Sequence, residues 1–228
     1  MILNNVVIDD VLDSKSVSIP SDVLKSALER VVFAAATDDS RPVLTGVNFE
    51  LDKSGFTIAA ADGFRLAVEK VNFETEIIEP VKVIIPAKTL VELQRLLVDS
   101  SSNVKLSLNT NGRSARFKLD NSEVVTSLVQ GTFPDYDKLI PDEFSTKAQV
   151  GLTDMIQATK AASIFARDGS GIIRLLISSQ NNGDIKIISR AEEVGSNENN
   201  IQANVEGDES KVAFNSRFLL DVLGVFDS

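Results

Sequence analysis

The chain has no cysteine, no histidine and no tryptophan among its 228 residues. Without cysteine there are no disulfides and no thiolate chemistry, and the redox compartment cannot be read from the sequence. Without histidine, Ser-His-Asp triads, Cys-His pairs and histidine-bound zinc are excluded. Any catalysis would therefore depend on carboxylates, lysine, the single tyrosine Tyr136 or a metal held by oxygen ligands.

Long hydrophobic runs are also missing. No segment approaches the roughly 18 apolar residues of a membrane-spanning helix, and Met1–Leu12 lacks the basic start and small-residue cleavage site of a secretory signal. Hydrophobic residues make up 43% of the chain, charged residues make up 25%, and the net charge is −10. This composition is typical of a soluble globular protein, and we expect a cytoplasmic location with no membrane partner.

Acidic residues occur in adjacent pairs at Asp9-Asp10, Asp38-Asp39 and Glu192-Glu193. Side chains of neighbouring residues point in different directions on a strand or a helix, so solvated charge explains these pairs better than a catalytic site. We therefore expect no catalytic residue, no metal and no cofactor. A carboxylate- or metal-dependent enzyme on a β-rich scaffold is the weakest alternative.

A short β-type run meets the start of a helix four times along the chain. The helix starts fall at Pro20, Pro86, Thr153 and Asn215, with spacings of 66, 67 and 62 residues. Proline is tolerated at the first helical position, and threonine and asparagine are common N-caps. A near-constant period indicates one supersecondary unit used repeatedly. We predict helices over 21–36, 87–98, 153–167 and 215–226.

Each of the first three predicted helices is followed by β-type runs. They span 43–51, 56–61 and 64–73 after the first helix, 104–108, 115–119 and 124–129 after the second, and 172–178 and 185–189 after the third. Asp62-Gly63, between two such runs, is a strong hairpin signal. We interpret the polar residues Ser196–Asn200 as a loop. The pattern predicts an α+β fold of repeated β-α-β-β-β units.

The segment Gly131–Thr146 interrupts this pattern with two prolines, as connectors often do. We predict a first domain over 15–133, a connector over 134–146 and a second domain over 147–228, with 1–14 as a linker or the remnant of a preceding domain. The fourth repeat contains only its first strand and helix. We therefore expect a fragment of a longer protein, with a truncated second domain.

The predicted helices carry seven basic and five acidic residues, although the chain as a whole is acidic. A solvated helix face explains such a pattern. A mildly positive surface on an acidic body also suits loose contact with a nucleic-acid backbone.

Four motifs occur in order along the chain: RPVLTG over Arg41–Gly46, ADGFRLA over Ala61–Ala67, FPDY over Phe133–Tyr136 with Ile140-Pro141 after it, and NSRFLLDVL over Asn215–Leu223. No single motif is specific, but together they resemble the bacterial sliding clamp family, the beta subunits of DNA polymerase III. The resemblance extends from about Lys15 to Phe226. It implies the DNA clamp fold, with the family's middle domain and most of its C-terminal domain.

In that family, two subunits form a ring with helices inside and antiparallel sheets outside, and duplex DNA passes through the hole. The resemblance implies a processivity factor, a non-catalytic subunit of a nucleotidyltransferase holoenzyme. The implied partners are double-stranded DNA, held loosely and without sequence preference, and the polymerase III alpha subunit and clamp loader, bound through linear peptides. The full-length protein would self-associate into a homodimer ring. The alternative is a clamp-like peptide-binding module that does not encircle DNA.

The family binds partner peptides in a pocket between its middle and C-terminal domains. The matching positions here are Leu44, Ala61, Gly63, Arg65, Leu66, Pro134, Lys138 and Leu139. The apolar side chains would form walls, and Arg65 would orient a peptide carbonyl or carboxylate. Without the resemblance, Leu44 and Leu66 would be strand core and Gly63 a turn residue.

Three features depart from the family pattern around this pocket. Phe64 stands where histidine is common, and Lys138 stands where arginine is frequent. The sequence also ends before the tail that forms one wall of the family's pocket, so we expect weakened peptide binding.

The resemblance further implies that basic residues on the helices face DNA: Lys25, Lys88, Arg95, Lys160, Arg167 and Arg217. Asp38 occupies a loop position where the family can contact DNA, but an acid there would repel phosphate, so it is not included. Ile164 and Phe165 match the hydrophobic part of the family's ring-closing interface. Core burial is the alternative for at least one of the two.

Overall fold

The computed structural model describes residues 15–73, 79–97, 102–109, 113–167, 170–180, 183–191 and 195–226. The chain divides into two compact units, unit 1 over Met1–Pro134 and unit 2 over Asp135–Ser228. The predicted linker 1–14 and the acidic pair Glu192-Glu193 lie outside the described residues.

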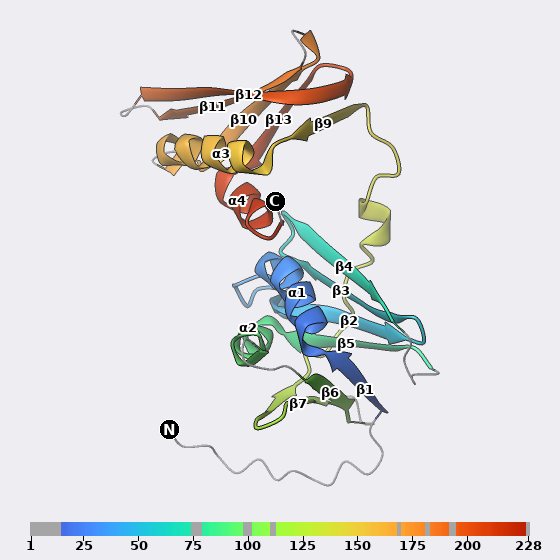
Figure 1. Ribbon diagram of the computed structural model, residues 1–228. Coiled ribbons are helices and arrows are strands. Elements are labelled where there is room, and N and C mark those ends of the chain that lie inside the picture. The colour runs from blue at the N-terminus through green and yellow to red at the C-terminus, as the bar shows by residue number, and fades with distance from the viewer. Residues whose placement is uncertain are drawn as a thin grey trace. The chain divides into compact units, whose positions relative to one another are not determined.

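Unit 1 contains two copies of one β-α-β-β-β unit (Figure 1), which confirms the predicted repeat. The first copy comprises β1 (Lys15–Pro20), α1 (Ser21–Val31), β2 (Gly46–Asp52), β3 (Gly55–Ala61) and β4 (Leu66–Asn72). The second comprises β5 (Val81–Pro86), α2 (Ala87–Leu96), β6 (Asn103–Leu108), β7 (Ser114–Lys118) and β8 (Glu123–Ser127). Two short 3-10 turns, η1 (Val32–Ala34) and η2 (Pro42–Thr45), lie between α1 and β2.

Both helices of unit 1 begin directly after a proline and bury one apolar stripe. Leu24, Leu28 and Val31 recur at helical spacing in α1 and are buried, as an amphipathic helix on a core requires. Leu90 and Leu93 do the same in α2. α1 is shorter than predicted because the chain tightens into the turn η1 after Val31.

The two copies exchange their first strands. β5 pairs with β2 in the sheet β4-β3-β2-β5, and β1 pairs with β6 in the sheet β1-β6-β7-β8. The two prolines occupy equivalent register positions, since Pro20 faces Asn103 and Pro86 faces Gly46. This reciprocal exchange is what an approximate two-fold relation between the copies produces. α1 and α2 contact each other, so the two helices of unit 1 are adjacent.

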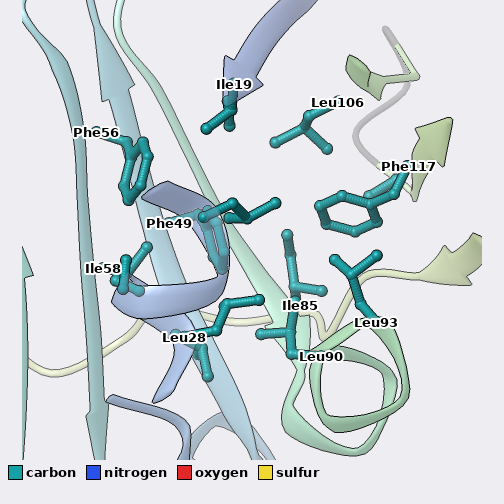
Figure 2. Packing of buried hydrophobic residues seen from close by; sticks show 14 of the residues in the cluster. Ile19, Leu28, Phe49, Phe56, Ile58, Ile85, Leu90, Leu93, Leu106 and Phe117 are labelled. Atoms are coloured by element: carbon teal, nitrogen blue, oxygen red, sulfur yellow. The ribbon is translucent and has the colours of Figure 1, made fainter. Parts of the chain in front are cut away.

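A single hydrophobic core joins both sheets and both helices of unit 1 (Figure 2). Phe49 and Ile58 come from one sheet, Leu106 and Phe117 from the other, and Leu90 from α2; all five are fully buried. Burying a side chain of this size contributes roughly 1.5–3 kcal/mol relative to exposure. The core therefore ties the two copies into one unit.

Unit 2 contains a third copy and the beginning of a fourth. After the turn η4 (Asp137–Leu139), its elements are β9 (Thr146–Val150), α3 (Leu152–Arg167), β10 (Ile172–Ser178), β11 (Asp184–Ala191), β12 (Gly195–Gly207), β13 (Ser210–Asn215) and α4 (Ser216–Leu223). They form the sheet β13-β10-β11-β12-β9. β13 pairs with β10 as β5 pairs with β2, and Asn215 faces Ile172.

Asn215 also caps α4, as the sequence predicts. Its side-chain oxygen accepts hydrogen bonds from the backbone N–H of Arg217 at 3.0 Å and of Phe218 at 3.4 Å. These bonds satisfy two of the donors that a helix start leaves without an intrahelical partner.

The predicted loop at Ser196–Asn200 is wrong, because these residues belong to β12. They pair with residues 186–190 of β11, and Glu198 makes a 2.7 Å ion pair with Lys186 of that strand. Pairing with a neighbouring strand satisfies the backbone here, whereas the polar composition alone suggests a loop.

Candidate functional site

The hairpin turn between β3 and β4 carries four of the predicted pocket residues. Ala61 ends β3, Leu66 begins β4, and the two face each other directly across the hairpin. Gly63 lies in the turn at φ +91°, a left-handed conformation that favours glycine. Arg65 directly precedes Leu66. The structure thus brings these four positions together at one end of a sheet.

The Asp62 carboxylate organises this turn. Its Oδ1 accepts hydrogen bonds from the backbone N–H of Phe64 at 2.9 Å and of Arg65 at 3.1 Å, and its Oδ2 accepts one from Arg65 Nε at 3.0 Å. The Arg65 guanidinium also lies 5.5 Å from the centroid of the Phe33 ring, within cation–π range. Arg65 is therefore held in one position, whereas the Phe64 side chain is 82% exposed.

Arg41, which is not among the predicted pocket residues, supports the turn from outside. Its Nη2 donates a hydrogen bond to the Asp62 carbonyl at 2.6 Å. Its guanidinium packs so closely on Gly63 that a Cβ there would lie 2.4 Å from Nη1. Position 63 therefore favours glycine for its φ, and a side chain there would also displace the Arg41 guanidinium. No local sequence pattern links Arg41 to a turn 21 residues later.

The remaining pocket positions are distributed over both units. Leu44, in η2, is only 5% exposed, so its side chain is largely core. Pro134 is exposed at the end of unit 1. Lys138 and Leu139 are exposed in η4 of unit 2, where Lys138 Nζ lies 3.1 Å from a carboxylate oxygen of Asp135. Six of the eight positions thus belong to unit 1 and two to unit 2.

The predicted DNA-facing residues of unit 1 lie on α1 and α2. Lys25 Nζ is 3.8 Å from Glu29 Oε1, and Arg95 Nη1 is 2.8 Å from Glu92 Oε1. Lys88 is exposed. Because exposed ion pairs of this kind contribute only about 0–1 kcal/mol, they leave the cations of unit 1 partly neutralised but accessible.

The predicted DNA-facing residues of unit 2 are Lys160 and Arg167 on α3 and Arg217 on α4. All three are exposed, and within the described ranges no ion pair involves any of them. Asp154 is the acidic residue in the first turn of α3, so positive charge lies toward the end of this helix.

The loop residue Asp38 is exposed, and its carboxylate accepts hydrogen bonds from Ser40, two residues later in the chain. Hydrogen bonds from the Ser40 hydroxyl and from the Ser40 N–H lower the pKa of the Asp38 carboxyl. The group therefore remains ionised, and an anion at this position disfavours a phosphate contact.

Ile164 and Phe165 differ in their surroundings on α3. Ile164 is 57% exposed, whereas Phe165 is half-buried beside the buried Ala162 and Ala166. The Ile164 side chain is thus exposed enough to contact another surface, whereas part of the Phe165 side chain is already buried within unit 2.

Two further findings on the described part of the chain concern metal ions and membranes. This part contains no group of three or more acidic, histidine or cysteine side chains placed to hold a metal ion. None of its helices is long and apolar enough to cross a membrane. A cavity of about 340 Å³ lies between β5 and Leu128–Phe133, and none of the predicted pocket residues lines it.

The fold of unit 1, two β-α-β-β-β copies with exchanged strands and adjacent helices, is that of a DNA clamp domain. Residues 18–135 match the family model of the DNA polymerase III beta subunit central domain, and residues 137–228 match that of its C-terminal domain. The chain therefore belongs to the DNA polymerase III beta-subunit family.

Individual relatives agree with this assignment. The chain is 34% identical to the beta sliding clamp of Staphylococcus epidermidis over 208 residues, which cover 90% of this chain and 54% of that protein. The crystal structure of the Bacillus subtilis DNA polymerase sliding clamp superimposes with a TM-score of 0.88 at 31% identity, covering 97% of this chain and 58% of that one. The Thermotoga maritima beta subunit gives 0.85 at 28% identity, covering 95% and 57%. The chain spans about half the length of the curated relatives it matches.

Proposed function

We propose that this chain is part of a replication sliding clamp, a processivity factor that encircles duplex DNA in the cytoplasm and has no catalysis of its own. The observation that carries the proposal is the match of two clamp-domain models to 18–135 and 137–228. The full-length protein would close into a homodimer ring, with Ile164 in the contact. It would tether the polymerase III alpha subunit and the clamp loader through linear peptides.

The charge distribution supports loose rather than tight contact with DNA. The chain carries a net charge of −10, and its exposed helix cations are few. A ring is retained on DNA by its topology, so strong phosphate contacts would only slow its sliding. We expect duplex binding no tighter than the roughly 10⁻⁴–10⁻⁶ M of non-specific complexes.

The proposed peptide pocket combines apolar walls with a charged rim. Leu66 and Ala61 form a directly opposed pair, and Asp62 fixes Arg65 beside them. Pro134 and Leu139 would complete the apolar walls above the largely buried Leu44, with Lys138 at the rim. An arginine held in place loses little conformational entropy when it binds a peptide carbonyl or carboxylate.

The test is an NMR titration of the whole chain with a peptide that carries a glutamine and two large apolar side chains. A micromolar complex corresponds to about −8 kcal/mol, and each buried apolar side chain supplies roughly 1.5–3 kcal/mol. We expect a dissociation constant of about a hundred micromolar, with shifts around Leu66. Leu66→Asp should abolish binding, because it places an unpaired carboxylate in the groove.

Val125→Asp is the matched control, since Val125 is a partly exposed strand residue on the other sheet. This variant should bind the peptide like the parent chain. Shifts confined to other regions, or a folded Leu66→Asp protein that binds normally, would contradict the assignment.

The second candidate function is a clamp-like peptide-binding module that does not encircle DNA. It is favoured by the placement of six of the eight pocket positions in unit 1. Retention on nicked circular DNA separates the two candidates. Protein that is held on the circle and released when the circle is cut encircles DNA, whereas peptide binding without such retention supports the module.

A further inference from the structure

The two sheets of unit 1 differ on the faces that point away from the core. In the sheet β4-β3-β2-β5, the residues Asn48, Ala59 and Ile84 on this face are buried. In the sheet β1-β6-β7-β8, the corresponding face is open except at the buried Ser107, and it carries Lys105, Arg116 and Lys118, which alternate with the buried core residues of β6 and β7. We call this open surface the basic sheet face.

Two lysines on the basic sheet face oppose each other directly. Lys105 of β6 is the register partner of Lys118 of β7, and both are exposed. Like charges at directly opposite positions destabilise a sheet. Within the described ranges, no ion pair involves either lysine, whereas Arg116 makes a 2.5 Å pair with Glu123 of β8. Glu123, which is also the register partner of Lys118, is the one carboxylate that the described strands place on this face beside three cations, in a chain that is acidic as a whole.

Several neighbours of these cations are serines, but Val125 of β8, which is 43% exposed, faces Arg116, and Glu123 faces Lys118. Ser18 of β1 faces Lys105, and Ser107 of β6 faces Arg116. Ser114 and Ser127 form a further cross-strand pair on the same face. The hydroxyls of Ser18 and Ser127 are exposed and can donate hydrogen bonds to anionic oxygens beside the lysines, whereas Ser107 is buried.

The described strands place no aromatic side chain on this face. Proteins that bind single-stranded nucleic acid generally stack bases on aromatic rings, so the chemistry favours recognition of charge without stacking. We propose that the basic sheet face docks an extended acidic peptide segment of a partner protein, rich in aspartate or glutamate. This site is separate from the peptide pocket and does not depend on the proposed function.

The test uses the whole chain and a fluorescein-labelled peptide of alternating aspartate and serine, with an asparagine-serine peptide as the neutral probe. Fluorescence anisotropy should show binding of the acidic peptide only, weakening as salt is raised to roughly 0.15 M because the charges are exposed. Lys105→Ser with Lys118→Ser should weaken binding about tenfold or more. The matched control is Lys70→Ser with Lys82→Ser, on the outward face of the other sheet, which should bind like the parent chain.

Thermal unfolding separates loss of the site from loss of the fold. Because the Lys105/Lys118 variant relieves a like-charge contact, it should unfold at a temperature no lower than the parent chain. Unchanged peptide binding in this variant, or an equal loss in the Lys70/Lys82 control, would overturn the proposal. If the parent chain ignores the acidic peptide but binds an oligonucleotide that the Lys105/Lys118 variant does not bind, the face serves nucleic acid and the proposal is wrong.

Discussion

α2 of unit 1 and α4 of unit 2 occupy equivalent positions in the repeat but are buried to different extents. α2 contacts β2, β5 and β8, and its Leu90 and Leu93 are fully buried. The equivalent residues of α4, Leu219 and Val222, are half-buried where α4 packs on β13 and α3. A helix's apolar stripe is therefore a property of its sequence, whereas the depth of its burial depends on how many strands cover it.

The surfaces differ between the units as well. The basic residues Lys25 and Arg95 of unit 1 have carboxylates beside them on the same helix, whereas Lys160 and Arg167 on α3 make no ion pair within the described ranges. Repetition of a fold thus preserves the core positions and leaves the surface charges free to diverge.

The largest expected effect concerns the difference in burial between Leu90 of α2 and Leu219 of α4. Leu90→Ala should lower the free energy of unfolding of unit 1 by about 2–5 kcal/mol, because it leaves a cavity in a closed core. Leu219→Ala, at the equivalent half-buried position, should cost less than about 2 kcal/mol. Urea unfolding followed by NMR signals from each unit measures both changes. Equal losses would show that the two helices are equally covered.

The next prediction compares two turns of unit 1. Asp62 and Asp52 each accept hydrogen bonds from residues that follow them in a hairpin turn, but only Asp62 holds Arg65. Asp62→Ala should weaken binding of the glutamine-containing peptide about tenfold, or 1.4 kcal/mol. Asp52→Ala should leave it unchanged. A similar effect of both variants on peptide binding would mean that general loosening, and not the position of Arg65, is responsible.

A smaller effect is expected from the helix cations. Lys160→Ala with Arg167→Ala should reduce the slope of log affinity against log salt for duplex DNA by about 2. Lys25→Ala with Arg95→Ala should reduce it by less than about 1, because neighbouring glutamates already neutralise these residues in part. The two slopes are measured by titrating the binding of a fluorescently labelled duplex at several salt concentrations. Identical slopes for the two double variants would contradict this prediction.

The smallest effects concern two cross-strand ion pairs and act at opposite ends of the pH scale. Burial alone would raise the pKa of Glu50, but hydrogen bonds from Lys82 and Asn48 outweigh it, so the pKa of Glu50 is lowered. The Glu50 contribution to stability is present above the ordinary glutamate pKa of about 4.3 and is lost as pH falls through the lowered value. The pair is partly exposed, so we expect less than about 1 kcal/mol, and Glu50→Gln should remove this dependence.

In unit 2 the hydrogen bond to Glu198 raises the pKa of Lys186. Its contribution is therefore present below the ordinary lysine pKa of about 10.4 and is lost as pH rises through the raised value. Thermal unfolding of Glu50→Gln and Lys186→Met across the pH range measures both effects. If both variants lost stability at the same end of the pH scale, the sign of one of these two contributions would be wrong.

Local sequence patterns predicted much of the fold because their signals are short-range. Pro20 and Pro86 mark helix starts, Asn215 caps a helix, and Asp62-Gly63 forms a hairpin turn. The candidate pocket was different. Family resemblance supplied its residues, but Arg41 and Phe33, which support the turn and Arg65, are distant in sequence and leave no local signal.

The period of the repeat, the apolar stripe of each helix and the family can all be predicted from the sequence, because they depend on residue order and spacing. The tertiary structure alone decided which copy each first strand joins, since Pro20 and Pro86 end similar strands that pair outside their own copy. The tertiary structure also places Ser196–Asn200 in a strand and makes Lys105 and Lys118 direct partners across two strands. The physical reason is that strand pairing forms hydrogen bonds between residues far apart in the chain, and hydrophobicity patterns do not encode those partners.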